Sequence, residues 1–133
     1  MLQDEVADRL VAKPGSSDYG VLSVMAQYAA DITKAFKVSA QCFRPRPEVS
    51  SAVVLLRSKA QVPLRAEEEP AFTALVKASF AHRRKTLVNS LRDEDYDQRL
   101  VANALNDMGI PLTIRAETLA LDQFTDLTKR LAV

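Results

Sequence analysis

The sequence predicts an α/β domain followed by a small helical domain, and three observations support this prediction. Val49 to Arg57 is an apolar run rich in β-branched residues, which is typical of a strand. Beyond Pro63, apolar residues recur at helical spacing in successive stripes. The character of the chain changes near Gln61 to Glu69. We therefore expect an α/β domain over residues 1–62 and a helical domain over residues 63–133.

The first domain is expected to begin with the end of a strand at Met1 to Gln3. Lys13 to Asp18 contains the turn-forming residues Pro, Gly and Ser, so we expect a loop there. Ser23 is a suitable N-cap for a helix running to about Asp31. The apolar positions of this helix are Val24, Met25, Tyr28 and Ala29.

Two further strands follow in the first domain. Ile32 to Val38 is a plausible strand, although Lys34 to Lys37 also fits a helix. Val49 to Arg57 is the clearest strand and is apolar at successive positions, so both of its faces are expected to be buried. A strand buried on both faces belongs inside a layered α/β sheet.

The second domain reads as a small bundle of helices. Glu67 to Pro70 is a good helix start, with acidic residues and a proline in the first turn. The first stripe, with a break expected near Lys85, consists of Phe72, Leu75, Val76, Ser79, Phe80, Leu87 and Leu91. The second stripe ends at Gly109 and consists of Leu100, Val101, Ala104, Leu105 and Met108. A last helix is expected to begin near Asp122 and bury Phe124, Leu127 and Leu131.

Composition limits the classes of function that remain. At 133 residues and 47% hydrophobic content, the chain can form a core and is not of the disordered class. The formal charge of +1 gives no global signature of nucleic-acid binding, so any RNA surface must be a local patch. One cysteine, Cys42, and one histidine, His82, form neither an internal disulfide nor a metal cluster. We expect a cytoplasmic protein without metal or membrane partner, because the apolar runs are shorter than the roughly 20 residues of a membrane helix.

The stretch from Phe43 to Leu56 is the most informative part of the chain. It places one aromatic residue, two prolines and two arginines directly before or at the start of the predicted strand. Each proline fixes its own φ and favours extended geometry in the residue before it, which predicts a stiff, extended loop. Such a loop suits a flat substrate such as a base. The same pattern is compatible with a rigid loop entering an edge strand, with Phe43 filling the core.

This stretch resembles the F-x-P-x-P-x-V-x-S-A-V-V segment of the rRNA adenine dimethyltransferases, S-adenosylmethionine-dependent enzymes that methylate adenine N6 in ribosomal RNA. Four further segments are similar to family motifs and occur in the family's order. They are Met1–Ala7 (M-L-Q-K-E-V-A), Tyr19–Val24 (Y-G-x-L-S-V), Phe80–Leu87 (F-x-x-R-R-K-T-L) and Gly109–Glu117 (G-I-x-x-x-x-R-A-E). The resemblance covers nearly the whole chain.

The resemblance implies the C-terminal half of such an enzyme, because the family's donor-binding Gly-rich loop and its N-L-P-Y motif are missing. Gly15, Gly20 and Gly109 are far apart and form no G-x-G pattern. The implied fold is the C-terminal strands and helix of a Rossmann-like methyltransferase sheet, followed by a helical rRNA-binding domain. S-adenosylmethionine is expected in the full-length parent and not on this fragment, which should be inactive alone. Met1 could be a start codon or the family's own methionine.

By the same resemblance, Phe43 packs against the target adenine, and Pro45 and Pro47 complete the contact with the base. Stacking of a base on an aromatic ring is worth roughly 1–3 kcal/mol, comparable to the cost of extruding the base. Arg44 and Arg46 flank Phe43 and could hold the phosphates beside the flipped base. No catalytic residue is expected in this fragment.

Arg83, Arg84 and Lys85, with Arg92 further on, form the strongest local basic cluster. At about 100° per residue of a helix they would fan across a solvent face. Without the family context, an ordinary charged helix face would be the preferred interpretation. The resemblance instead implies an RNA-facing surface, on which arginine binds phosphate through planar, bidentate hydrogen bonds. His82 is expected to face RNA or solvent.

Structural roles are the preferred interpretation for four other residues of the motifs. Asn89 is expected to cap or cross-link its helix, and Arg115 with Glu117 is expected to form an ion pair or lock a turn. Gly20 is expected to supply a turn geometry that other residues resist.

The sequence therefore predicts a fragment of an rRNA adenine N6,N6-dimethyltransferase whose partner is small-subunit rRNA or a ribosomal subunit precursor. The alternative is a non-enzymatic RNA-binding or ribosome-assembly module that uses the same surface. A third interpretation is that neither half binds RNA detectably without the other. A sheet without its neighbouring strands leaves an exposed edge and an apolar face. We expect the isolated chain to compensate by dimerising, by exchanging strands or by partial disorder.

Overall fold

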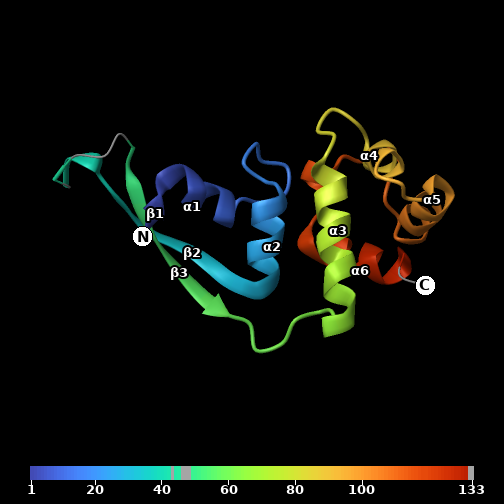
Figure 1. Cartoon of the computed structure of the whole chain (residues 1–133), viewed down its shortest axis with the longest axis horizontal. Coiled ribbons are helices and arrows are strands. Elements are labelled where there is room, and N and C mark those ends of the chain that lie inside the picture. Colours follow the sequence, from blue (N-terminus) through green and yellow to red (C-terminus); the bar gives the residue numbers. More distant parts are fainter. Residues whose placement is uncertain (43, 46–48, 132–133) are drawn as a thin grey trace.

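The computed structural model describes residues 1–42, 44–45 and 49–131. Figure 1 shows a small sheet at one end of the molecule and a group of helices at the other, with α2 and α3 between them. The sheet has three strands, β1 (Leu2–Gln3), β2 (Ala30–Val38) and β3 (Ser51–Ser58), in the order β1-β3-β2. The structure thus confirms a mixed α/β chain with a strand over most of both predicted stretches.

The sheet is antiparallel, and much of β3 has a neighbour on one side only. β2 pairs with β3 from Ala30↔Ser58 to Val38↔Ser51, with an irregularity between Lys34 and Phe36. β1 pairs with β3 only at Leu2↔Ala52 and Gln3↔Ser51. Within the described part of the chain, no strand borders Val53 to Ser58 on the β1 side.

The prediction that β3 is buried on both faces is wrong for this chain. Leu55 and Leu56 point to opposite faces of the strand, yet they are 61% and 65% exposed. Ala52, beside β1, is fully buried. The difference arises because β1 borders only the first residues of β3. An apolar run shows what a strand is able to bury, whereas actual burial depends on what lies beside it.

The helix α1 (Asp4–Val11) follows β1 directly and was not anticipated from the sequence. Asp4 and Glu5 lie in its first turn and Arg9 in its last, which complements the helix dipole. Ala7 and Leu10 form its buried face. With only eight residues, α1 offers a short apolar pattern that is difficult to recognise.

The next helix, α2 (Val21–Ala29), begins before Ser23, which is therefore not its N-cap. Gly20 occupies that position, and its N–H donates to the Ser23 hydroxyl over 3.2 Å. The expectation of a special glycine geometry is also wrong. Gly20 has φ −166°, which other residues adopt, and no atom lies within 4 Å of the position that a Cβ would take.

The remaining elements agree with the predicted helical stripes and their break. In chain order they are η1 (Ala40–Cys42) between β2 and β3, then η2 (Ala66–Glu68), α3 (Glu69–Phe80), α4 (Leu87–Asp93), α5 (Gln98–Asp107), η3 (Ala116–Thr118) and α6 (Leu121–Leu131). Thr86 caps α4 by accepting a hydrogen bond from the Asn89 N–H. Gly109 follows α5 with φ +72°, a left-handed geometry that favours glycine. No described helix is long and apolar enough to cross a membrane.

A continuous apolar core joins the first segment to the helices. The Tyr28 ring lies 4.8 Å from that of Phe72, and the Tyr19 hydroxyl donates to the Leu119 carbonyl over 2.7 Å. Leu100 was expected in the second stripe but is 54% exposed, because it lies on the outer side of α5. The largest fully buried side chains of the described residues are Phe72, Phe124, Leu75, Leu87, Leu91, Leu105, Leu119 and Leu127.

Candidate nucleic-acid interface

Arg83, Arg84 and Lys85 lie in the loop between α3 and α4, and all three are exposed. The expectation that they fan across a helix face is wrong, because α3 ends at Phe80 and the chain turns before α4 begins. The Lys85 N–H donates to the His82 carbonyl over 3.0 Å, which closes this turn. The loop therefore presents the cations at the end of a helix pair.

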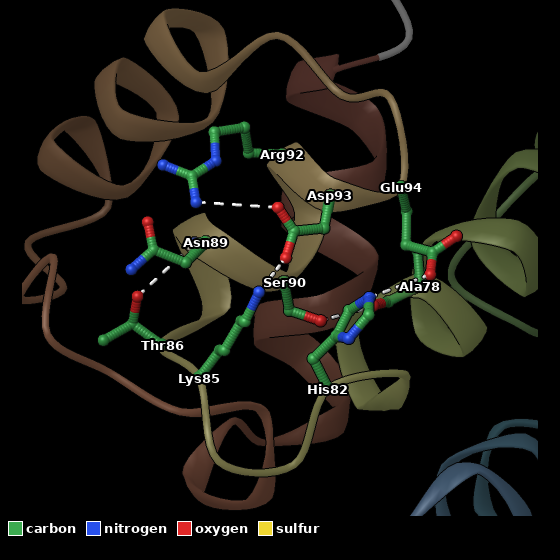
Figure 2. A network of polar contacts seen from close by, with 9 residues as sticks. All are labelled: Ala78, His82, Lys85, Thr86, Asn89, Ser90, Arg92, Asp93 and Glu94. Carbon is green, nitrogen blue, oxygen red and sulfur yellow. Dashed lines mark hydrogen bonds and ion pairs between the residues drawn. The ribbon is translucent and has the colours of Figure 1, made fainter.

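Acidic residues of α4 and its C-terminal end occupy part of this basic cluster (Figure 2). The Lys85 ammonium contacts the Asp93 carboxylate, and the Arg92 guanidinium lies 3.5 Å from the other oxygen of the same carboxylate. The hydrogen bond from Lys85 holds the pKa of Asp93 below its usual value. The His82 Nε2 atom is 3.1 Å from the Glu94 carboxylate. Lys85 and Arg92 thus already have an acidic partner.

Arg83 and Arg84 differ from the other members of the cluster. Neither makes an ion pair within the described residues 1–42, 44–45 and 49–131. Two exposed guanidinium groups without carboxylate partners are suited to binding phosphate by bidentate hydrogen bonds. Of the predicted cations in this cluster, these two are the most available for a ligand.

A hollow of about 180 Å³ lies beside the same loop. Its cationic side chains are Arg83, Lys85 and Arg115, and one carboxylate, Glu117, also borders it. Three segments distant in sequence form its wall: Ser17 and Tyr19, then Ser79, Phe80, His82, Arg83 and Lys85, then Arg115, Ala116 and Glu117. A concave surface with excess positive charge attracts an anionic ligand.

Arg115 was interpreted from sequence as structural, and its side chain instead borders the hollow. Its carbonyl accepts from the N–H and the hydroxyl of Thr118, which locks a turn as one of the two expectations had it. The Gly15 N–H donates to the Glu117 carbonyl over 2.6 Å. An Arg115–Glu117 ion pair, the other expectation, is not present among the described contacts. The spacing along the chain gave no signal that Arg115 and Arg83 would border the same hollow.

Tyr19 is the aromatic residue at the wall of the hollow with a polar end. Burial, with a smaller contribution from the charge of Asp122, raises the pKa of Tyr19 to about 12. The phenol therefore stays protonated at neutral pH and donates to the Leu119 carbonyl. It acts as a structural link and not as an acid or base.

The loop between β2 and β3 contains the other predicted site residues. Phe43, Arg46 and Pro47 lie outside the described residues, whereas Arg44 and Pro45 are described and are exposed. Figure 1 shows the described ends of this loop at the outer end of the hairpin, across the molecule from the α3–α4 loop. The structure thus does not bring Arg44 close to Arg83 and Arg84.

The strand-to-helix connections of the described residues lack the Gly-rich turn that often binds a nucleotide-like ligand. The connections from β1 into α1 and from β3 into α3 contain no glycine, so neither offers a Gly-rich turn for close backbone approach to a ligand. Groups of three or more His, Cys, Asp or Glu residues able to hold a metal are likewise absent from the described ranges.

Comparison with known proteins places these features in a family. The full chain, residues 1–133, matches the family model described as ribosomal RNA adenine dimethylase. It is 45% identical over 127 residues to the ribosomal RNA small subunit methyltransferase A of Chlamydia caviae, covering 96% of this chain and 45% of that protein. The protein of the same name from Lachnoclostridium phytofermentans is 42% identical over 130 residues, with coverage of 96% and 45%. The chain thus spans about half the length of these relatives.

Two solved structures have a similar fold. A dimethyladenosine transferase from Plasmodium falciparum superposes with a TM-score of 0.76 at 22% identity, covering 94% of this chain and 53% of that one. The 23S rRNA methyltransferase ErmE superposes with a TM-score of 0.66 at 26% identity, with coverage of 98% and 52%.

Proposed function

The chain belongs to the ribosomal RNA adenine dimethylase family, and from this premise we propose that it is the C-terminal half of an enzyme that methylates adenine N6 in small-subunit rRNA. The parent enzyme would use S-adenosylmethionine and act in the cytoplasm during ribosome assembly. Relatives named small subunit methyltransferase A support this substrate. The order of the five motifs supports the C-terminal position, with residues 1–62 ending a Rossmann-like catalytic domain and residues 63–133 forming an rRNA-binding domain.

This chain would supply only part of the chemistry. Methyl transfer requires a bound donor, a positioned amino group and a base taken out of its stack. The first two requirements would be met by the rest of the parent enzyme, since the described strand-to-helix connections have no Gly-rich turn for the donor. Phe43, with Pro45 and Pro47, would contact the extruded base, and Arg44 and Arg46 would contact its flanking phosphates. These roles rest on the family motif.

Arg83 and Arg84 would provide the principal phosphate contacts of the helical domain. The observation that carries this assignment is their exposure without an acidic partner in the described residues. Arg83 also borders the hollow, together with Arg115. Lys85 and Arg92 would contribute less, because binding phosphate would require them to share or leave the Asp93 carboxylate. Glu117 would oppose an anion in the hollow.

The test separates the donor site from the RNA surface. The purified chain is titrated with a fluorescent small-subunit rRNA transcript and, separately, with labelled S-adenosylmethionine. We expect salt-sensitive RNA binding and no donor binding. Binding of the donor by this chain would contradict the placement of the donor site in the rest of the parent enzyme. Absence of RNA binding even at low salt would contradict the role of the helical domain.

The open edge of β3 supports a second proposal, self-association with a further copy of the chain. Val53 to Ser58 has no partner on the β1 side within the described residues, and Leu55 is 61% exposed. Antiparallel pairing of this strand with itself is compatible with a two-fold dimer and would cover the edge in both copies. Light scattering tests this. Leu55→Lys should reduce the dimer, whereas Leu100→Lys, at an exposed leucine of α5, should not.

A further inference from the structure

Asp4 bonds to both stems of the loop formed by residues 39–50. Its N–H donates to the Ser50 carbonyl over 2.9 Å, directly before β3 begins. Its carboxylate lies 2.6 Å from the Lys34 ammonium and 3.3 Å from that of Lys37. Lys37 precedes Val38, the last residue of β2. One residue at the start of α1 therefore joins the strand that enters the loop to the segment that leaves it.

The charges around Asp4 favour this arrangement. Its side chain is only 21% exposed, and the hydrogen bond from Lys34 is the main cause that lowers the pKa of Asp4 below its usual value. Lys34 also contacts Asp8, one turn further along α1, and both carboxylates raise the pKa of Lys34. Asp4 and Lys34 therefore both carry charge at neutral pH.

The pairing depends on an acidic residue at position 4. A lysine there would face the ammonium groups of Lys34 and Lys37 and repel them. The charge of Asp4 is therefore complementary to the charges of Lys34 and Lys37 in β2.

We propose that Asp4 is a positioning residue that restrains the two stems of the loop of residues 39–50 in addition to the Val38↔Ser51 pairing of β2 with β3. This inference rests on the proposed function in one respect: a loop that contacts an extruded base benefits from stems of fixed geometry. The restraint itself requires no RNA and is testable without it.

Cys42 permits a direct test, because it is the single cysteine of the chain, is exposed and lies within this loop. A nitroxide attached to Cys42 reports local mobility through its electron paramagnetic resonance line shape. We expect Asp4→Asn to narrow the central line of the electron paramagnetic resonance spectrum, because the label becomes more mobile when the loop stems lose this restraint. The matched control is Glu5→Gln, which removes the same charge from the neighbouring residue of α1, where the carboxylate pairs only with Arg9 among the described residues. The control should leave the line shape unchanged.

The pH dependence supplies a second measurement. A carboxylate with a lowered pKa keeps its ion pairs until the pH falls through that lowered value, so the label should become more mobile there. Asp4→Asn should lack this transition, and Lys37→Met, which leaves the Lys34 contact, should give an intermediate line shape. Circular dichroism confirms that each variant is folded. Equal spectra for Asp4→Asn and the unaltered chain, or equal narrowing by Glu5→Gln, would overturn the proposal and leave the RNA-binding assignment untouched.

Discussion

Replacing Arg83 and Arg84 by glutamine should change how the affinity for RNA depends on salt. Both side chains are exposed and have no ion pair in the described residues, so their loss should cost the fold little. Each phosphate contact contributes about 0.7 to 0.9 to the slope of log affinity against log salt. Two lost contacts should therefore reduce the magnitude of the slope by about 1.4 to 1.8.

The expected effect is large enough to measure. Between about 50 mM and about 200 mM KCl, a slope change of this size corresponds to about tenfold in affinity. The variant should bind more weakly at low salt. Across this range of KCl, the factor by which its affinity falls should be about tenfold smaller than for the unaltered chain. Fluorescence anisotropy of a labelled small-subunit rRNA transcript, recorded at several KCl concentrations, gives the slope.

The control is Arg99→Gln with Lys129→Gln, which removes the same charge from exposed positions on α5 and α6 that do not border the hollow. Its slope should remain close to that of the unaltered chain. An unchanged slope after replacement of Arg83 and Arg84, or an equal change in the control, would refute the assignment of these arginines as phosphate contacts.

Three further predictions concern stability and assembly. Tyr19→Phe should lower the free energy of unfolding in urea by about 1–3 kcal/mol, because the buried Leu119 carbonyl loses its donor; no change would show that water replaces the phenol. Asp93→Asn should flatten the acid limb of stability against pH, because the Lys85 ion pair stabilises the fold above the lowered pKa of Asp93 and is lost as the pH falls through it. Leu55→Lys should keep the circular dichroism spectrum and shift light scattering toward the monomer, whereas an unchanged dimer would place the interface elsewhere.

The helices that could be predicted from sequence are those in which a long apolar stripe coincides with a local start or stop signal. The helix α3 begins at Glu69, inside the predicted start Glu67 to Pro70, and Gly109 follows α5 with the left-handed geometry that glycine favours. The short helix α1 has few apolar positions and was overlooked. Ser23 has the chemistry of an N-cap but lies inside α2, because Gly20 already occupies the capping position.

Burial and site geometry were harder to predict, because both depend on segments distant in sequence. The apolar run of β3 indicated burial on both faces, but β1 borders only its first residues and Leu55 stays exposed. The sequence identified Arg83 and Arg84 as a candidate site through their clustering. The sequence contained no signal for Arg115, which borders the hollow beside Arg83 only because η3 lies beside the end of α3.

The core that joins Tyr19 and Tyr28 to the helices bears on fragment complementation. The exposed connection around Gln61 to Pro63 is accessible to a protease. Cutting it would not remove the packing of Tyr28 against Phe72 or the hydrogen bond from Tyr19 to the Leu119 carbonyl. The two pieces should therefore remain associated after cleavage, and separately expressed pieces should reassemble when mixed.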